Sequence, residues 1–144
     1  MLVGKKIKAT KSTPLLPANI RGVATYVDAA GVLTFVAVSD VAFVASTGAA
    51  LAMFPLGPVT EAIKSGKPDA VLVENAYEVL NVASSLFNEV EGTTVHVKVQ
   101  KLVIGPLAPE LLKRIAKPTS RLDMDIAIPG YPNGKLSFIA VAAT

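Results

Sequence analysis

A carboxylate and an amide stand three residues apart in the run ENAYEVLNVASSLFNE, residues 74–89. On a helix, Glu78 and Asn81 project from the same side, because residues three apart are neighbours on the helix surface. The carboxylate can pair with a lysine of a partner, and the amide, which both donates and accepts hydrogen bonds, can orient a water molecule for attack. This pair suits hydrolysis of an acyl phosphate on another protein, where the bond is labile and positioning supplies most of the catalysis.

The pair belongs to a longer polar stripe along the same stretch of sequence. Helical spacing places five polar residues on one face, namely Glu74, Glu78, Asn81, Ser85 and Asn88. Apolar residues with the same spacing form the opposite face, namely Val73, Ala76, Tyr77, Leu80, Ala83 and Phe87. The pattern predicts an amphipathic helix, capped by Asp69 and ending near Asn88, whose polar row is either a solvent-exposed face or a functional surface.

Other residues give weaker chemical candidates. His96, Asp123 and Asp125 are a possible set of ligands for a divalent metal, but carboxylates two residues apart are common on strands, and a stable site needs ligands held by surrounding hydrogen bonds. The chain has no cysteine and no phosphate-loop, dinucleotide-binding or G-x-S-x-G motif. We therefore predict no metal site and no cofactor of its own.

Composition and charge narrow the class of protein. With 144 residues, 51% hydrophobic and 17% charged, the chain can form one domain with a sizeable core and is not disordered. The net charge of +3 is too small to indicate nucleic-acid binding, and four lysines cluster near the N-terminus, at positions 5, 6, 8 and 11. The lack of cysteine and of a signal-peptide core predicts a cytoplasmic protein.

Residues 31–57 raise the alternative of a membrane span, because Asp40 is their single charge over a length that can cross a bilayer. However, Ser39-Asp40 is a helix-capping signal in the middle of this run. β-Branched and aromatic residues precede it and alanines follow it, which favours a strand leading into a core helix. We predict no membrane association.

The elements that must position the stripe follow from periodicity and turn signals. The patterns predict strands near 5–10 and at 20–27, 31–38, 95–104, 122–128 and 135–141, and helices at 41–53, 59–64, 69–88 and 109–116. We find no short internal repeat. This order predicts an α+β domain, a largely antiparallel sheet with long helices packed on one face. It divides the chain into a basic N-terminal arm, residues 1–19, and a single domain, residues 20–144.

In these motifs the sequence resembles the CheC/CheX/FliY phosphatases of bacterial chemotaxis, which dephosphorylate the response regulator CheY. That family carries an acidic residue or serine, a Glu one helical turn later, an Asn on the next turn, and a proline further on. Glu74, Glu78 and Asn81 match in order and spacing, and Pro106 stands close to the expected proline. The runs GVATYVDAAGVLTFVAVSDVAFVASTGAALAMFP and DMDIAIPGYPNGKLSFIAV resemble the family's hairpin with its following helix and its closing hairpin.

The resemblance implies roles for the stripe. Asn81 would orient the attacking water, Glu78 would bind the active-site lysine of a CheY-like receiver domain, and Glu74 would be an accessory contact. Ser85 and Asn88 would extend the partner-binding face, and the Mg²⁺ would belong to the regulator. The alternative is a non-catalytic module of the same fold that docks a receiver domain or another signalling protein through this face.

One departure from the family concerns the N-terminus. Family members commonly begin with a helix that packs beside the motif helix, whereas the start of this chain is lysine-rich and interrupted by prolines at positions 14 and 17. Without that helix, apolar surface is left for a partner. Together with the apolar composition, this departure predicts a homodimer.

Overall fold

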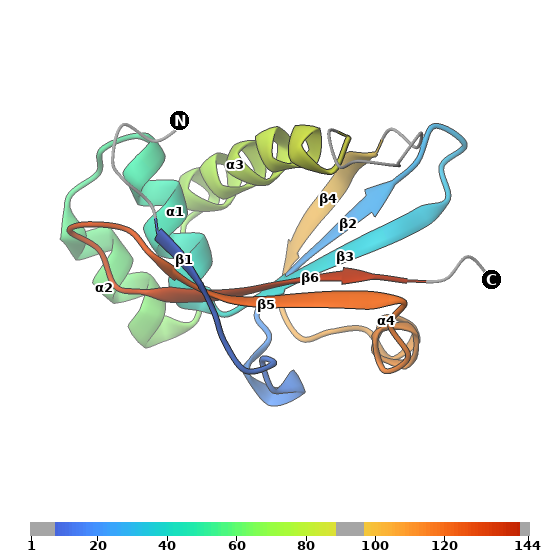
Figure 1. Cartoon of the computed structure of the whole chain (residues 1–144). Coiled ribbons are helices and arrows are strands. Elements are labelled where there is room, and N and C mark those ends of the chain that lie inside the picture. The colour runs from blue at the N-terminus through green and yellow to red at the C-terminus, as the bar shows by residue number, and fades with distance from the viewer. Residues whose placement is uncertain (1–7, 89–96, 142–144) are drawn as a thin grey trace.

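The structure is a computed structural model that describes residues 8–88 and 97–141, with the backbone alone for residues 83–88 (Figure 1). Its strands are β1 (Lys8–Lys11), β2 (Gly22–Val27), β3 (Leu33–Ser39), β4 (Lys98–Ile104), β5 (Ser120–Ala127) and β6 (Gly134–Ala140). Its helices are the 3₁₀ turn η1 (Pro17–Asn19), α1 (Val41–Leu51), α2 (Leu56–Ser65), α3 (Ala70–Asn88) and α4 (Pro109–Ile115). These elements match the predicted ones to within a few residues.

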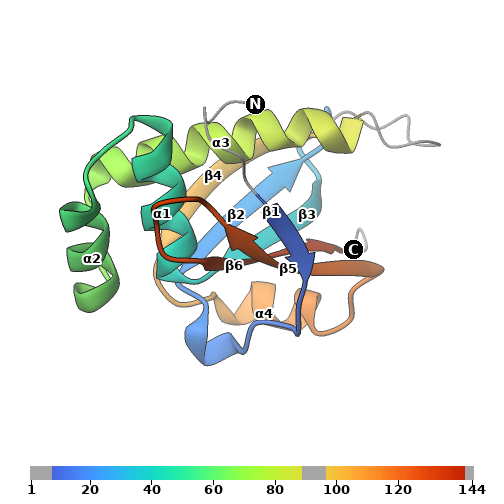
Figure 2. The same cartoon turned by 60° about the vertical axis from the view of Figure 1, so that its left-hand side comes forward.

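One antiparallel sheet organises the fold, with the strand order β1-β5-β6-β3-β2-β4. The long helices α1 and α3 lie on one face of the sheet, and the short helix α4 lies on the other (Figures 1 and 2). Helix α2 stands beside α1, where Val59 and Ala62 pack with Ala45 and Ala49. Apolar clusters fill both spaces, one under α1 and α3 and a second in which Ile115 of α4 packs with Val36 and Ile139. The predicted α+β class, with its largely antiparallel sheet and long helices on one face, is confirmed.

Residues 8–19, which the sequence assigns to the basic arm, belong to this sheet and its core. Strand β1 pairs with β5, from Lys8 opposite Ala127 to Lys11 opposite Met124. Leu15 is buried in the cluster on the α4 side. Lys5 and Lys6 lie outside the described residues. The part of the arm that the structure describes is an edge strand and a connection that packs against the sheet.

Strands β3 and β6 carry a repeat that sequence analysis missed. LTFVAV at residues 33–38 corresponds to LSFIAV at residues 136–141. Val36 and Ile139 occupy equivalent positions in the repeat and pair with each other, so an approximate two-fold axis passes between them. The sheet order is consistent with this axis, since β3-β2-β4 runs outward on one side and β6-β5-β1 on the other. The two copies differ at two of six positions, with Ser in place of Thr and Ile in place of Val. A repeat this short is therefore easy to miss in the sequence.

Residues 31–57 were considered as a possible membrane span. They contain the strand β3 followed by the core helix α1, as their composition predicted. The Asp40 carboxylate caps α1 by accepting a hydrogen bond from the Phe43 N–H at 2.9 Å. Among residues 8–88 and 97–141, no helix is both long enough and apolar enough to cross a membrane.

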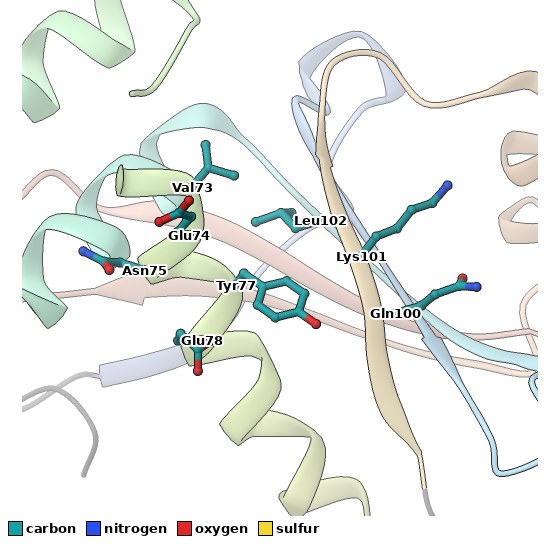
Figure 3. A pocket seen from close by; sticks show the side chains of 8 residues that line it. All are labelled: Val73, Glu74, Asn75, Tyr77, Glu78, Gln100, Lys101 and Leu102. Atoms are coloured by element: carbon teal, nitrogen blue, oxygen red, sulfur yellow. The ribbon is translucent and has the colours of Figure 1, made fainter. Parts of the chain in front are cut away.

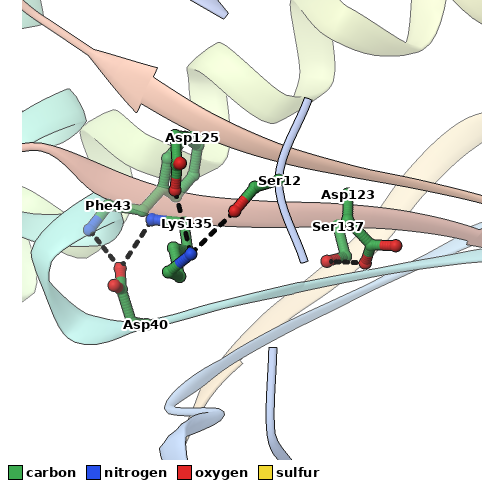
Figure 4. Close-up of polar contacts among 7 residues, drawn as sticks. All are labelled: Ser12, Asp40, Phe43, Asp123, Asp125, Lys135 and Ser137. Atoms are coloured by element: carbon green, nitrogen blue, oxygen red, sulfur yellow. Dashed lines mark hydrogen bonds and ion pairs between the residues drawn. The ribbon is translucent and has the colours of Figure 1, made fainter. Parts of the chain in front are cut away.

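Asp40 also ties α1 to β6. The same oxygen, Oδ1, accepts from the backbone N–H of Lys135 at 3.1 Å (Figure 4). Burial raises the pKa of the Asp40 carboxyl above its ordinary value. The two hydrogen bonds and the charge of Lys135 lower the pKa, but by less than burial raises it. A carboxyl with a raised pKa binds its proton more tightly in the folded state than in the unfolded state. Its contribution to stability therefore falls as pH rises through the raised pKa.

We expect Asp40→Asn to remove this pH dependence, because the amide oxygen can accept both hydrogen bonds without carrying a charge. The free energy of unfolding of the variant should rise relative to wild type as the pH increases from the ordinary aspartate pKa through the raised pKa of Asp40. Asp40→Ala, which loses both bonds, should cost about 1 kcal/mol. Urea unfolding at several pH values measures both effects. A difference between Asp40→Asn and wild type that stays constant with pH would contradict the assignment.

Candidate functional site

The polar stripe lies on the exposed side of α3. Glu74, Glu78 and Asn81 are exposed, whereas Ala76 and Leu80 on the opposite side are buried in the core. The side chains of Ser85 and Asn88 lie outside the described part of the helix, so their place on the stripe stays a prediction. The described stripe residues form a convex surface that another protein can reach.

An open groove of about 520 Å³ runs between α3 and β4, beside this stripe (Figure 3). Glu74 and Glu78 border the groove on the helix side, and the Tyr77 ring points toward β4 with its hydroxyl foremost. The remaining lining residues are Val73, Asn75, Gln100, Lys101 and Leu102. The groove therefore combines an apolar lining with two carboxylates, an arrangement that can accept a cationic side chain with its aliphatic stem. Sequence reasoning missed the β4 residues.

A β-bulge shapes the β4 side of the groove. Val99 pairs with Tyr26 but Lys101 pairs with Thr25, which leaves Gln100 as the extra residue. The Thr25 hydroxyl donates to Gln100 Oε1 at 3.1 Å. After the bulge, Leu102 points toward α3 while Lys101 points away from it (Figure 3). Within the described sheet β4 pairs only with β2, so the groove opens at a sheet edge.

Tyr26 of β2 anchors the turn of α3 that carries the candidate pair. Its side chain is fully buried, and its hydroxyl donates to the backbone carbonyl of Leu80 at 2.9 Å. Burial raises the pKa of the Tyr26 hydroxyl well above its ordinary value, so the group stays a neutral donor. Leu80 directly precedes Asn81. This hydrogen bond therefore fixes the position of the Glu78–Asn81 turn relative to strand β2.

A second anchor joins α3 to α1. The Asn75 side chain donates from Nδ2 to the backbone carbonyl of Gly48 at 3.0 Å. The two helices approach so closely here that a Cβ on Gly48 would overlap the Leu72 carbonyl oxygen. Glycine inside a helical pattern often has such a packing reason, which is the one sequence signal for this contact. The anchors at Asn75 and Leu80 lie on either side of Glu78 and fix the helix along its length.

We expect Tyr26→Phe to lower the free energy of unfolding by about 1 kcal/mol, since it removes one buried hydrogen bond and keeps the aromatic packing. Amide hydrogen exchange in α3 should quicken around residue 80. Tyr77→Phe is the matched control, because the Tyr77 hydroxyl lines the open groove and its loss should change stability by less than about 0.5 kcal/mol. Equal effects of the two variants would show that Tyr26 does not anchor the helix.

Asp123 and Asp125, two of the three residues weighed as metal ligands, have hydrogen-bond partners in the structure. Both lie on β5, four strand positions from β4 in the sheet order. Asp123 accepts a hydrogen bond from Arg121 Nε at 2.8 Å. It accepts another from Ser137 Oγ at 2.6 Å (Figure 4). Asp125 pairs with Lys135 at 3.0 Å, and the Lys135 ammonium holds the pKa of Asp125 below its ordinary value. The third candidate, His96, lies outside the described residues. Among those described, no three His, Cys, Asp or Glu residues are placed to hold a metal ion.

Solved structures resemble this fold although no family model and no curated protein sequence matches the chain. The chain is similar to FliY from Thermotoga maritima, with a TM-score of 0.62 and 15% identity over 98% of this chain and 79% of that one. It is also similar to the FliM middle domain from H. pylori, with a TM-score of 0.60 and 6% identity over 97% and 79% of the two chains. A more distant match, with a TM-score of 0.48 and 7% identity over 96% and 84%, comes from the CheX–CheY–BeF₃–Mg²⁺ complex of Borrelia burgdorferi.

At these identities the similarity establishes the fold. The chain has the fold that FliY and the FliM middle domain share, as the resemblance in the sequence implied. The chemistry of the stripe therefore has to be argued from its own residues.

Proposed function

We propose that this protein hydrolyses the aspartyl phosphate of a CheY-like response regulator, with α3 as the catalytic helix. The observation that carries the proposal is the exposed Glu78 and Asn81 pair, one turn apart on a helix that is anchored from the sheet and from α1. In the complex, Glu78 accepts a charge-assisted hydrogen bond from the active-site lysine of the receiver domain. Asn81 holds the attacking water through its amide, and Glu74 is an accessory contact.

In the proposed reaction, the water oxygen attacks the phosphorus while the P–O bond to the aspartyl carboxylate breaks. The products are inorganic phosphate, which takes the oxygen and both protons of the water, and a free aspartate carboxylate on the regulator. The Mg²⁺ of the regulator neutralises the phosphoryl oxygens, so this chain has to supply position and not a metal. An amide on a rigid helix is sufficient for that task.

The shape of the site supports a protein substrate. Glu74, Glu78 and Asn81 stand on a convex helix and not at the bottom of a pocket, so they can enter a concave site on another molecule. The adjacent groove gives that molecule a second place of contact. A small free phosphate ester would leave both features unused.

The test is phosphate release from a panel of acyl-phosphorylated receiver domains in Mg²⁺ buffer, with and without this protein. We expect faster release for at least one regulator. Binding without acceleration would instead support the non-catalytic docking module, and absence of binding would mean that the stripe is a solvent-exposed face. Self-association and cytoplasmic location stay predictions from the sequence.

A further inference from the structure

A second cavity, of about 570 Å³, shares no lining residue with the groove beside α3. It is bordered by the connection before β2, the start of α1, the end of α2 and the start of β6. Its volume lies within the range of small-molecule sites, about 300–1,000 Å³. None of the stripe residues Glu74, Glu78 and Asn81 lines it. The cavity is therefore a place for a ligand that the proposed phosphatase reaction leaves unused.

Three cations from separate elements line this cavity. Arg21 directly precedes β2, Lys64 lies in the last turn of α2, and Lys135 belongs to the start of β6. Asp40 is the one carboxylate among the described residues that line it. Cations repel each other at close range, so an anion placed between them relieves that repulsion. We call the space lined by these four residues the Arg21 cavity.

The Arg21 guanidinium is held in place with one edge free. Its Nη1 donates to the carbonyls of Ala18 and Ile20, both at 2.8 Å. The other edge, formed by Nε and Nη2, has no hydrogen-bond or ion-pair partner within the described residues. That edge presents two parallel N–H groups, which can bind a phosphate or a carboxylate through two hydrogen bonds. Arg21 can therefore bind an anion without giving up the bonds that position it.

The two lysines add donors to this edge. The Lys64 ammonium has no hydrogen-bond or ion-pair partner in the described part of the chain. Lys135 Nζ donates to Ser12 Oγ at 2.8 Å and to Asp125 Oδ1 at 3.0 Å (Figure 4). An ammonium has three donors, so Lys135 keeps one for a ligand while the other two hold it in position. Lys135 thus contributes a fixed donor and Lys64 an adaptable one.

Asp40 gives the cavity a hydrogen-bond acceptor. Its Oδ1 accepts the two backbone hydrogen bonds from Phe43 and Lys135 (Figure 4). Its Oδ2 has no partner within the described residues. A hydroxyl group of a ligand can donate to this oxygen. The lining therefore fits a ligand that carries both an anionic group and a hydroxyl group.

The number of donors favours a phosphate monoester as the anionic group. Three separate cations match the three acceptor oxygens of a phosphate monoester, which carries about −1.5 to −2 charges at pH 7, whereas a carboxylate has two oxygens and one charge. Asp125 offsets part of the Lys135 charge. Arg21 and Lys64 stay without ion-pair partners among the described residues, so the lining remains positive.

We propose that the Arg21 cavity binds a small phosphate monoester whose body carries hydroxyl groups, with the phosphoryl oxygens bound by Arg21, Lys64 and Lys135. One hydroxyl group of the ligand donates to Asp40 Oδ2. The site lies on other elements than α3, and its ligand takes no part in the hydrolysis of an aspartyl phosphate.

The test is an NMR titration of the ¹⁵N-labelled protein with glucose 6-phosphate, at physiological ionic strength so that weak surface binding is screened. We expect saturable shifts at the amides of Arg21, Val41 and Ser65, which line the cavity, with a Kd of about 1 mM or tighter. Glucose, which lacks the phosphate, and succinate, which has two carboxylates, should each bind at least about tenfold more weakly.

Charge-removing variants locate the binding site. Lys64→Gln and Arg21→Gln should each weaken binding of glucose 6-phosphate about tenfold, since each removes a charge-assisted hydrogen bond. Lys113→Gln is the matched control, because it makes the same change in net charge at an exposed lysine of α4 that does not line the cavity, and it should change nothing. Arg21→Gln also loses the bonds to Ala18 and Ile20, so its melting temperature is measured as well. If it unfolds, Lys64→Gln decides the result.

Three results would overturn the proposal. The first is the absence of saturable shifts with glucose 6-phosphate up to about 10 mM. The second is equal weakening by Lys64→Gln and Lys113→Gln, because the ligand would then respond only to the overall positive charge. The third is binding of succinate as tight as that of glucose 6-phosphate, because the cavity would then accept any small dianion. Each of these results would leave the proposed phosphatase activity untouched.

Discussion

Asn81→Ala should reduce acceleration of phosphate release by at least about 100-fold, the usual effect of removing one positioned polar group from a hydrolytic site. Within residues 78–81, the Asn81 amide is the only side-chain group that can both donate to and accept from a water, and alanine supplies neither function. Binding of the receiver domain should stay within about threefold of wild type, since the charge pair of Glu78 and the apolar contacts remain. Single-turnover phosphate release and titration calorimetry measure the two quantities separately.

Two variants make this result specific to the site. Asn133→Ala removes an exposed amide from the loop between β5 and β6 and should leave both rate and affinity unchanged. Glu78→Ala should weaken binding by about tenfold or more, because it removes a charge-assisted hydrogen bond to the regulator. If Asn81→Ala kept most of the activity, the water would be positioned by another group. If it lowered affinity and rate in parallel, the stripe would be a docking face.

Gly48→Ala should destabilise the protein by about 2 kcal/mol, although alanine is normally the better helix residue by about 1 kcal/mol. The added methyl group would overlap the Leu72 carbonyl, an atom of the α3 backbone that no side-chain rotation can move aside. The helices must separate, which weakens the hydrogen bond from Asn75 to the Gly48 carbonyl. For a domain of this size the melting temperature should fall by about 4–8 °C.

Gly57→Ala is the matched control for this prediction. Gly57 lies in the first turn of α2, and no other part of the described structure approaches the position of its missing Cβ within 4 Å. The same substitution there should leave stability unchanged or raise it by up to about 1 kcal/mol. Thermal unfolding by circular dichroism compares the two variants. Equal melting temperatures for both would show that α1 and α3 tolerate separation and that their contact does not constrain the stripe.

Gly48→Ala also tests whether the scaffold governs the site. Gly48 contacts α3 at Leu72 and Asn75, one to two turns before Glu78. A helix displaced at that point carries Glu78 and Asn81 with it, and a small displacement is enough to disturb a positioned water. We therefore expect the folded fraction of Gly48→Ala to have a lower kcat.

The sequence by itself determined the elements, because their signals act over a few residues. The period of the α3 residues placed Glu74, Glu78 and Asn81 on one exposed face, and the Asp40 cap marked the start of α1. The turn residues between β5 and β6 marked the closing hairpin. Each of these features depends on neighbouring side chains and backbone, so it can be read from a short window of sequence.

Only the tertiary structure decided how these elements support the candidate site. The bond from Tyr26 to Leu80 spans 54 positions in the chain and that from Asn75 to Gly48 spans 27. The pairing of β3 with β6 likewise joins the two halves of the molecule, and it reveals the repeat that the sequence concealed. Such contacts depend on strand register and helix packing, which no local propensity specifies. The stripe was therefore predictable, whereas its anchors and the groove became visible only in the folded chain.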